Sequence, residues 1–404
     1  MCVLEAAIVP VGVVWVSRTP SDRRAQTPRV ATDTSRSREG YKYKFMEPVW
    51  PGAAPTIDLS EDGTTVELAL RIDQALREWG LFLVCNHGVP QGLIDRMWAF
   101  TKAFHALPPE RKRALSQKVG HMGYKQSEGG LDARFENAFP EDCAKAKHNQ
   151  WPDESTDELR GFHETTVAFT KAVHGIVRRI LPLLEQSMDL EPGTLADAGT
   201  DAQYFLNIRH FPDRGDTAER VCCIRPHTDS GVFTLLPQQD KRGFEICLPD
   251  GRWVPVGPPA VGGGGQTWFL VQAGDCLRRW TNHRYVSALH RVVPHPGTGD
   301  RYAMPLFWGP GESYPMRPLP GCSDPMSNPE RYPEPITYHD YMIGFEARKY
   351  STVSTLTAAQ VRAADDNRID EGAYWTPPPH TDERDGEHAD KSAAQVNKRP
   401  RISK

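Results

Sequence analysis

The spacing of apolar residues separates an amino-terminal part with helical periodicity from a later part built of short apolar runs. Apolar side chains recur every three or four positions over 64–79 and again over 93–107, which predicts two amphipathic helices. The apolar run 81–85 between them predicts a short buried strand. A longer helical pattern covers 159–184, and Pro182 is expected to kink or end that helix.

Beyond residue 200, short runs rich in Val, Phe, Trp and Leu are separated by Gly, Pro and Asp. This spacing is typical of a β-sandwich or barrel. The candidate strands are 203–211, 233–236, 244–247, 253–256, 268–272, 284–293 and 302–308. We therefore expect a mainly β fold with flanking helices.

Both ends of the chain lack such patterning. Residues 17–45 hold eight Lys or Arg and three acids among Ser, Thr and Pro, and the chain beyond 355 is polar with a basic end. Because segments of this kind bury too little apolar surface to fold, we expect a disordered extension over 1–50 and a disordered tail over 355–404.

Composition restricts the class of partner. The 404 residues have a net charge of -4, which gives no electrostatic reason to bind nucleic acid or an anionic membrane. No apolar run reaches the roughly 20 residues that span a bilayer. Eight scattered cysteines without a C-x-x-C pair are typical of reduced thiols. We expect a cytoplasmic monomer whose partner is a small molecule, with no nucleic acid and no membrane.

His227 and Asp229 stand two residues apart, a spacing that on an extended strand turns both side chains to one face. Together they could hold a metal ion. The pair alone is weak evidence, because H-x-D often arises by chance and an exposed His–Asp pair is the simpler interpretation.

A second imidazole changes that interpretation. His290 lies in the apolar run 285–293, which has the pattern of a buried strand. Two imidazoles and one carboxylate leave open positions on a six-coordinate ion, as iron(II) oxygenases require. The same ligand types suit zinc or manganese, so the identity of the metal stays open at this point.

Arg301 follows His290 by eleven residues and opens the apolar run 301–308. A guanidinium that enters a core-like strand is costly unless an anion meets it. Its planar fork fits a carboxylate, so Arg301 is a candidate ligand for an organic acid. The alternative is a salt bridge within the protein.

These residues stand among ordered motifs that resemble the iron(II) and 2-oxoglutarate-dependent dioxygenases, the family of isopenicillin N synthase and the plant gibberellin and flavonoid oxidases. The resemblance covers residues 54–350. The motifs that support it are Pro55-Thr-Ile-Asp-Leu-Ser60, Trp79-Gly-Leu-Phe82, Asn86-His-Gly-Val-Pro90, Leu107-Pro-Pro-Glu110, Gly123-Tyr124, His227-Thr-Asp229, Thr234-Leu-Leu236, Ala273-Gly-Asp275, Trp280-Thr-Asn282, Ser287-Ala-Leu-His-Arg-Val292 and Arg301.

The resemblance implies a double-stranded β-helix, or jelly roll, in which His227, Asp229 and His290 bind iron(II) and Arg301 binds 2-oxoglutarate. It implies that dioxygen and 2-oxoglutarate are consumed while a small organic molecule is hydroxylated, desaturated or rearranged, as in secondary-metabolite biosynthesis. No side chain beyond the metal ligands is assigned a catalytic role. The chain would divide into a helical N-terminal dioxygenase region (54–190), a jelly-roll core (200–311) and a C-terminal helical cover (312–354).

Two positions depart from the family pattern. Ala303 stands where most members have the Ser of an Arg-x-Ser motif, and Phe211, ahead of Pro212, stands where they have Tyr. Each change removes a hydroxyl donor to 2-oxoglutarate, so we expect weaker binding of this co-substrate. Ethylene-forming members also tolerate Ala after the arginine.

Three rival functions remain at the level of sequence. An isopenicillin N synthase-type oxidase would need no keto acid and would use Arg301 for a substrate carboxylate. The other two are an ethylene-forming enzyme and a non-catalytic metal-binding protein.

The segment Gly262-Gly-Gly-Gly265 is an insertion that we interpret as a flexible loop. The substrate is not identified by the sequence.

Overall fold

A computed structural model describes residues 54–350 except 61–64, 118–121, 128–129, 214, 216–221, 240, 242, 249–250, 259–265, 294–298 and 335. The expectations for 1–50, for 355–404 and for the glycine segment 262–265 lie outside the described residues. None of the described helices is long and apolar enough to cross a membrane.

The described strands form two sheets. The large sheet has nine strands in the order β1-β2-β10-β7-β13-β5-β4-β3, with β12 also paired to β5. The small sheet has four strands in the order β6-β11-β8-β9. The strands of the large sheet are β1 (Thr56–Asp58), β2 (Leu81–Cys85), β3 (Gly123–Gln126), β4 (Ala133–Phe139), β5 (Gln203–Phe211), β7 (Phe233–Pro237), β10 (Phe269–Ala273), β12 (Arg301–Ala303) and β13 (Leu306–Gly309). Those of the small sheet are β6 (Ile224–His227), β8 (Phe244–Cys247), β9 (Trp253–Pro255) and β11 (His290–Val292).

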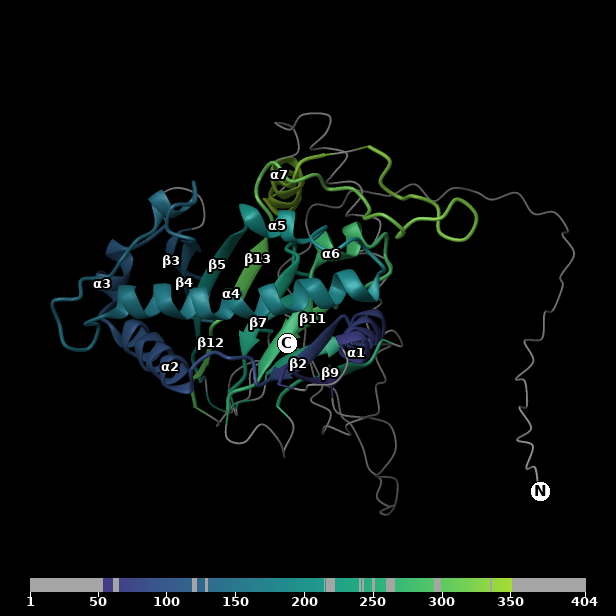
Figure 1. Cartoon of the computed structure of the whole chain (residues 1–404). Helices are drawn as coiled ribbons and strands as arrows, with labels where there is room; N and C mark the ends of the chain where they lie inside the picture. The colour runs from purple at the N-terminus through teal and green to yellow at the C-terminus, as the bar shows by residue number, and fades with distance from the viewer. Residues whose placement is uncertain are drawn as a thin grey trace, which may run out of the picture. The chain divides into compact units, whose positions relative to one another are not determined.

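Helices cover one face of the large sheet. The long helix α4 (Phe162–Ser187) packs against α1 (Thr65–Glu78) and α2 (Gln91–Ala106), and Figure 1 shows it running across the strands. The shorter helices are α3 (Pro109–Ala114), α5 (Ala196–Thr200), α6 (Asp275–Trp280) and α7 (Tyr338–Tyr350), and η2 (Ala146–His148) is a 3-10 turn.

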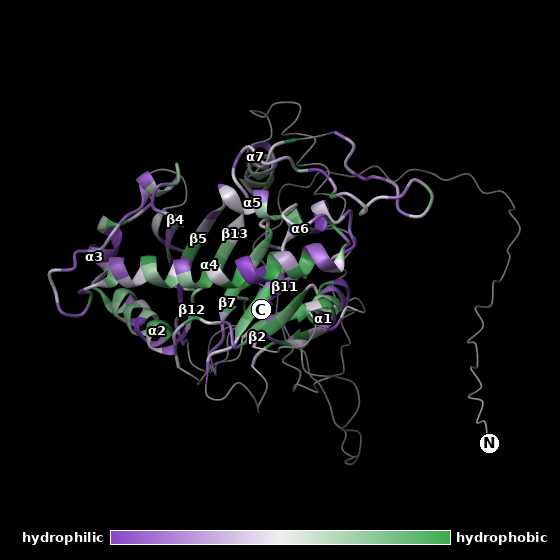
Figure 2. Cartoon of the chain, in the orientation of Figure 1, coloured by the Kyte–Doolittle hydropathy of each residue, from purple (hydrophilic) through white to green (hydrophobic). Residues whose placement is uncertain are grey.

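The strands β2, β7 and β10 of the large sheet are buried on both faces. In β2, Phe82 and Val84 join the core under the helices, whereas Leu81 and Leu83 join a second core that also contains Phe244 of the small sheet. This alternation follows from the two-residue period of a strand. The strands β2 and β7 are accordingly apolar in Figure 2. The face of the large sheet that carries Leu81 and Leu83 therefore looks toward the small sheet. This inner face carries part of the site.

The sequence predicted most of these elements. The helices over 64–79 and 93–107 and the strand 81–85 are confirmed, as is the mainly β fold with flanking helices. The division into regions 54–190, 200–311 and 312–354 stays a prediction, and strands β1 to β4 from the first of these ranges belong to the large sheet.

Pro182 does not end its helix, because α4 continues to Ser187, and the alternative that Pro182 kinks the helix stays a prediction. Two expectations about strands were wrong. The run 302–308 is two strands, β12 and β13, that separate at Pro305, which has no N–H to donate to a ladder. The strand expected over 284–293 is confined to β11, because the backbone N–H of Val286 bonds to the Leu76 carbonyl of α1 instead of a strand.

Candidate metal centre

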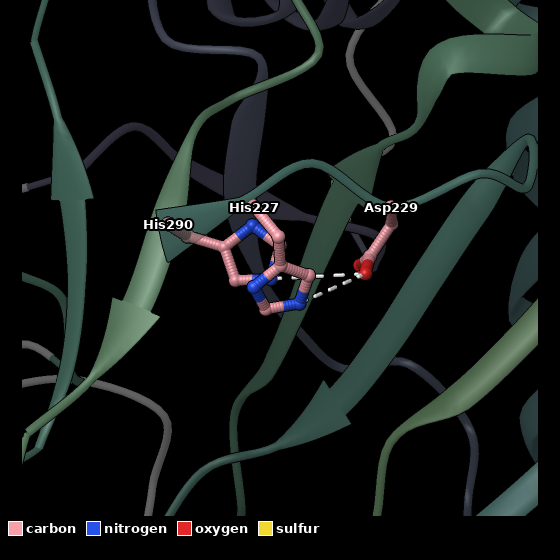
Figure 3. A group of neighbouring side chains, drawn as sticks. All are labelled: His227, Asp229 and His290. Atoms are coloured by element: carbon pink, nitrogen blue, oxygen red, sulfur yellow. Dashed lines mark ion pairs between the residues drawn. The ribbon is translucent and has the colours of Figure 1, made fainter. Parts of the chain in front are cut away.

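The small sheet and the loop that follows β6 bring His227, Asp229 and His290 together. His227 is the last residue of β6 and pairs in register with His290, the first residue of β11. Asp229 Oδ1 lies 3.7 Å from Nε2 of His227 and 3.7 Å from Nε2 of His290 (Figure 3). One ligand atom from each residue lies within 4.8 Å of the others, and no second group of this kind occurs in the described part of the chain.

Asp229 reaches this position from a loop, which differs from the expectation that the strand itself presents both side chains. The loop is held by the start of α6. The backbone N–H of Asp275 donates to the Asp229 carbonyl over 2.7 Å, and the Thr228 hydroxyl donates to Asp275 Oδ2 over 2.9 Å. Gly274 permits this close packing, because a Cβ there would lie 2.8 Å from the Asp229 carbonyl oxygen.

Two polar side chains on the inner face of the large sheet orient the candidate ligands. The hydroxyl of Thr234 on β7 donates to Asp229 Oδ2 over 2.5 Å. The carboxamide nitrogen of Gln272 on β10 lies 2.8 Å from His290 Nδ1 and 3.4 Å from Asp229 Oδ2. Asp229 therefore turns Oδ2 to the large sheet and leaves Oδ1 facing both imidazoles.

Both imidazoles fit the form that binds a metal. Nδ1 of His227 lies 2.8 Å from the Arg225 carbonyl, and Nδ1 of His290 lies 3.0 Å from the Ala288 carbonyl. A carbonyl selects a proton on Nδ1, which leaves the lone pair on Nε2, the atom that faces Asp229. The Gln272 carboxamide can accept the same proton of His290 through its oxygen after a 180° flip. Burial, with the nearby His290, holds the pKa of His227 well below its usual range, so this ring is neutral at pH 7.

Arg301 belongs to a different strand from the candidate ligands His227 and His290. It stands on β12, opposite Phe211 of β5, and its guanidinium is 5.0 Å from the centre of the Phe211 ring. Burial lowers the pKa of Arg301 to about 10, so it is still charged at pH 7. Its Nη1 is buried without a hydrogen-bond partner. A buried donor of this kind fits an anionic ligand better than the salt bridge that the sequence left open.

Other histidines of the sequence do not join the group. His210 Nε2 lies 2.7 Å from Asp300, and His283 bonds to the Tyr332 hydroxyl. His295 lies outside the described residues. The three candidate ligands are thus the ones that the sequence singled out.

Several inner-face residues were not given a role by the sequence. Thr234 and Gln272 each interrupt an apolar strand, and this interruption is the signal that marks them. Arg134 and Arg209 are polar residues of β4 and β5, which hold other polar residues as well. A polar residue at an inward position of a buried strand needs a partner, which makes it a candidate for a site.

Two family models match two separate parts of the chain. Residues 54–154 match the model of the non-haem dioxygenase in morphine synthesis N-terminal family. Residues 202–310 match the model of the 2OG-Fe(II) oxygenase superfamily.

Individual proteins extend this similarity. The chain is 29% identical over 307 residues to a 1-aminocyclopropane-1-carboxylate oxidase from Musa acuminata, a match that covers 74% of this chain and 95% of that protein. It is 31% identical over 283 residues to the 2-oxoglutarate-dependent dioxygenase traH from Penicillium crustosum, covering 63% of this chain and 83% of that protein. The crystal structure of a full-length Neurospora crassa protein in complex with alpha-KG and thymine has a similar fold, with a TM-score of 0.66, 22% identity, and coverage of 73% of this chain and 97% of that one.

Proposed function

The chain belongs to the 2OG-Fe(II) oxygenase superfamily, and from this premise we propose that His227, Asp229 and His290 bind its iron(II) and that Arg301 binds 2-oxoglutarate. The protein is a 2-oxoglutarate-dependent dioxygenase, an oxidoreductase that oxidises a small organic molecule with iron(II), 2-oxoglutarate and dioxygen. The double-stranded β-helix core expected from the sequence is confirmed by the similarity to solved oxygenase structures.

The observation that supports the iron site is the convergence of Asp229 Oδ1 on two imidazole Nε2 atoms, each 3.7 Å away. Two imidazoles and one carboxylate on one side of an ion form the three-ligand set of non-haem iron(II) oxygenases. Thr234 and Gln272 hold the carboxylate and one imidazole in place, as the partners of metal ligands commonly do.

The observation that supports the 2-oxoglutarate site is the buried Nη1 of Arg301, which lacks a hydrogen-bond partner. Its guanidinium can hold a carboxylate with two parallel hydrogen bonds. Ala303 and Phe211, beside and opposite it, contribute no hydroxyl, so Arg301 would bind the carboxylate without these donors.

Iron and 2-oxoglutarate, when bound, supply the oxidising chemistry, in which 2-oxoglutarate becomes succinate and carbon dioxide. The residues of the chain bind and orient these groups. Phe244, whose ring centre lies 5.3 Å from that of His290, belongs with Leu270 and Val292 to an apolar cluster that covers the His290 side of the site.

Succinate formation in air tests this assignment. The iron-loaded protein is expected to form succinate slowly from 2-oxoglutarate even without added substrate. Asp229→Ala and His290→Ala should lose iron, and Arg301→Gln should need at least about tenfold more 2-oxoglutarate for half-maximal rate. Arg160→Gln is the control, because the Arg160 side chain is 72% exposed. Iron retained by His290→Ala would show that the third ligand is wrong, and an absence of succinate in the wild type would favour an oxidase that needs no keto acid.

We propose a role in secondary metabolism because relatives include the dioxygenase traH and a flavone synthase from Petroselinum crispum. We propose that the protein binds neither nucleic acid nor an anionic membrane because its net charge is -4. We propose a cytoplasmic location because the scattered cysteines without a C-x-x-C pair are typical of reduced thiols, and we propose that the protein is a monomer. Sedimentation of the purified protein tests the monomer, and a stable dimer would contradict it.

A further inference from the structure

Four consecutive backbone carbonyls of the loop 229–232, which begins with the candidate ligand Asp229, accept hydrogen bonds. Three of them accept from the backbone N–H groups of 274–276, at the start of α6, over 2.7, 3.0 and 3.1 Å. The fourth, the Ser230 carbonyl, accepts from the side-chain hydroxyl of Tyr341 on α7 over 3.1 Å. The residue directly after the candidate ligand is thus held by a side chain 111 positions further along the chain.

Tyr341 lies entirely inside the protein. Its exposed fraction is 0%, and its ring stacks on that of Tyr338, with the ring centres 6.1 Å apart. A buried phenolic hydroxyl needs a hydrogen-bond partner, and the Ser230 carbonyl provides one. Breaking the contact would leave the buried hydroxyl without this acceptor, which is costly. The hydrogen bond therefore resists separation of α7 from the ligand loop.

The first turn of α7 is attached to the protein by contacts of its own. The Thr337 hydroxyl accepts from the backbone N–H of Asp340 over 3.1 Å and so caps the start of the helix. The backbone N–H of Tyr338 donates to the Tyr314 carbonyl over 2.8 Å, and that of His339 donates to the Glu312 carbonyl over 2.9 Å. Because these contacts do not involve the ligand loop, α7 can act as a fixed support for it.

Asp229 depends on such support more than the two histidines do. His227 and His290 are register partners on β6 and β11, so the ladder between these strands fixes their backbones. Asp229 lies in the loop after β6, and contacts from other elements fix its backbone. Because Ser230 follows Asp229 directly, a shift of Ser230 would turn the carboxylate away from the imidazoles. Metal affinity is sensitive to contacts that orient a ligand in this way.

We propose that Tyr341 is a positioning residue for the iron site and that its hydroxyl holds the Asp229 loop in the geometry that binds the metal. This proposal rests on the iron site proposed above. Coupling between two parts of a protein is reciprocal, so iron binding must stabilise the contact of α7 by the same factor by which the contact strengthens iron binding. The match to the oxygenase model ends at residue 310, so Tyr341 lies beyond the matched residues.

The affinity for iron(II), measured by anaerobic competition with a chelator, tests the positioning role. Tyr341→Phe removes only the hydroxyl and should weaken iron binding about fivefold or more, the effect of one lost hydrogen bond. Tyr338→Phe is the matched control and should bind iron as the wild type does, because its hydroxyl lies against Gly309 of β13. With iron saturating, Tyr341→Phe should keep the wild-type Kd for 2-oxoglutarate, whereas a general loss of structure would weaken both ligands.

Hydrogen exchange measures the reciprocal effect and needs no variant for its first result. Iron(II), added alone under anaerobic conditions, should slow the exchange of the backbone amides of 338–345 in the wild type. The same slowing is expected in Tyr338→Phe, and a smaller one in Tyr341→Phe. The ratio of the slowing in the wild type to that in Tyr341→Phe should equal the ratio of their iron affinities.

Three results would overturn the proposal. The first is equal iron affinity in Tyr341→Phe and Tyr338→Phe. The second is exchange of 338–345 in the wild type that iron does not change. The third is a Tyr341→Phe protein that loses affinity for 2-oxoglutarate as well as for iron, which would indicate a general structural role. Failure of the iron assignment itself would look different, because the wild type would then retain no more iron than Asp229→Ala.

Discussion

The hydroxyl of Thr234 on β7 donates a 2.5 Å hydrogen bond to Oδ2 of Asp229, the oxygen that does not face the two imidazoles. This contact joins the large sheet to the loop that follows β6. It fixes which carboxylate oxygen is available to a metal. The geometry of the candidate centre therefore depends on a residue that would not touch the metal.

Thr234→Val should lower the affinity for iron(II) by about 10- to 100-fold, the usual effect of removing a partner of a metal ligand. The reason is that valine keeps the shape of the side chain but cannot donate to Asp229. Thr234→Ser, which keeps the hydroxyl, is the matched control. Anaerobic competition with an iron(II) chelator measures the affinity, and equal values for the two variants would refute this role of the hydroxyl.

Gly274→Ala should destabilise the protein by about 1–3 kcal/mol and weaken iron binding. A Cβ at this position would collide with the carbonyl oxygen of Gly231 and lie 2.8 Å from that of Asp229, so the loop with the ligand must shift. Gly175→Ala in α4 is the control, because a Cβ there meets nothing within 4 Å. Urea unfolding and the chelator competition measure the two effects; a Gly274→Ala protein as stable as the control would contradict the packing argument.

Ala303→Ser should tighten the binding of 2-oxoglutarate by about tenfold, because one hydrogen bond to a charged group contributes roughly 1.5 kcal/mol or more. Ala303 is buried, on the same strand as Arg301 and two residues after it. Ala303→Cys adds a similar volume with a much weaker donor and is the control. The Kd for 2-oxoglutarate is measured anaerobically. If serine binds it no better than cysteine does, the added hydroxyl does not reach the co-substrate.

His105 should make the protein less stable in mild acid. Burial lowers the pKa of His105 to about 3 from an unfolded value of 6.5, with the charges of His210 and Lys112 acting in the same direction. Below the unfolded pKa of 6.5, the unfolded chain therefore binds a proton at His105 that the folded protein does not bind. The contribution of His105 to stability is complete above the unfolded pKa of 6.5 and decreases as the pH falls. The loss amounts to about 2 kcal/mol at a pH of about 5.

His105→Gln removes this titration and keeps a polar side chain near the Ile208 carbonyl, which His105 Nε2 approaches to 3.3 Å. The variant should lose less stability than the wild type between pH 7 and pH 5 in urea unfolding experiments. Parallel pH profiles for the two proteins would mean that His105 is not the group responsible.

The elements that the sequence predicted well are those with local causes. The helical spacing over 64–79 and the apolar run 81–85 gave bounds within one residue of α1 and β2. The segment 284–289 has the apolar pattern of a strand, but its hydrogen-bond partners lie far away in the sequence. Arg284 and Tyr285 both bond to the buried Asp73 of α1, and no local pattern reveals such a contact.

The candidate site likewise contains residues that the sequence predicted and residues that it did not predict. His227, Asp229, His290 and Arg301 could be named from their residue types and from motifs at family spacing. The pairing of Arg134 with Arg209 could not, because it depends on the register between β4 and β5. The polar residues of these strands were visible in the sequence, but which of them meet is decided by the sheet.

The central claim is that one iron(II) on His227, Asp229 and His290 also binds 2-oxoglutarate. Anaerobic titration of the iron-loaded protein with 2-oxoglutarate tests it most directly, since a keto acid that chelates iron(II) gives a weak visible absorption band. We predict a band that saturates at one equivalent of iron in the wild type and is absent in Asp229→Ala. A wild-type protein without the band, or an Asp229→Ala variant that keeps it, would contradict the claim.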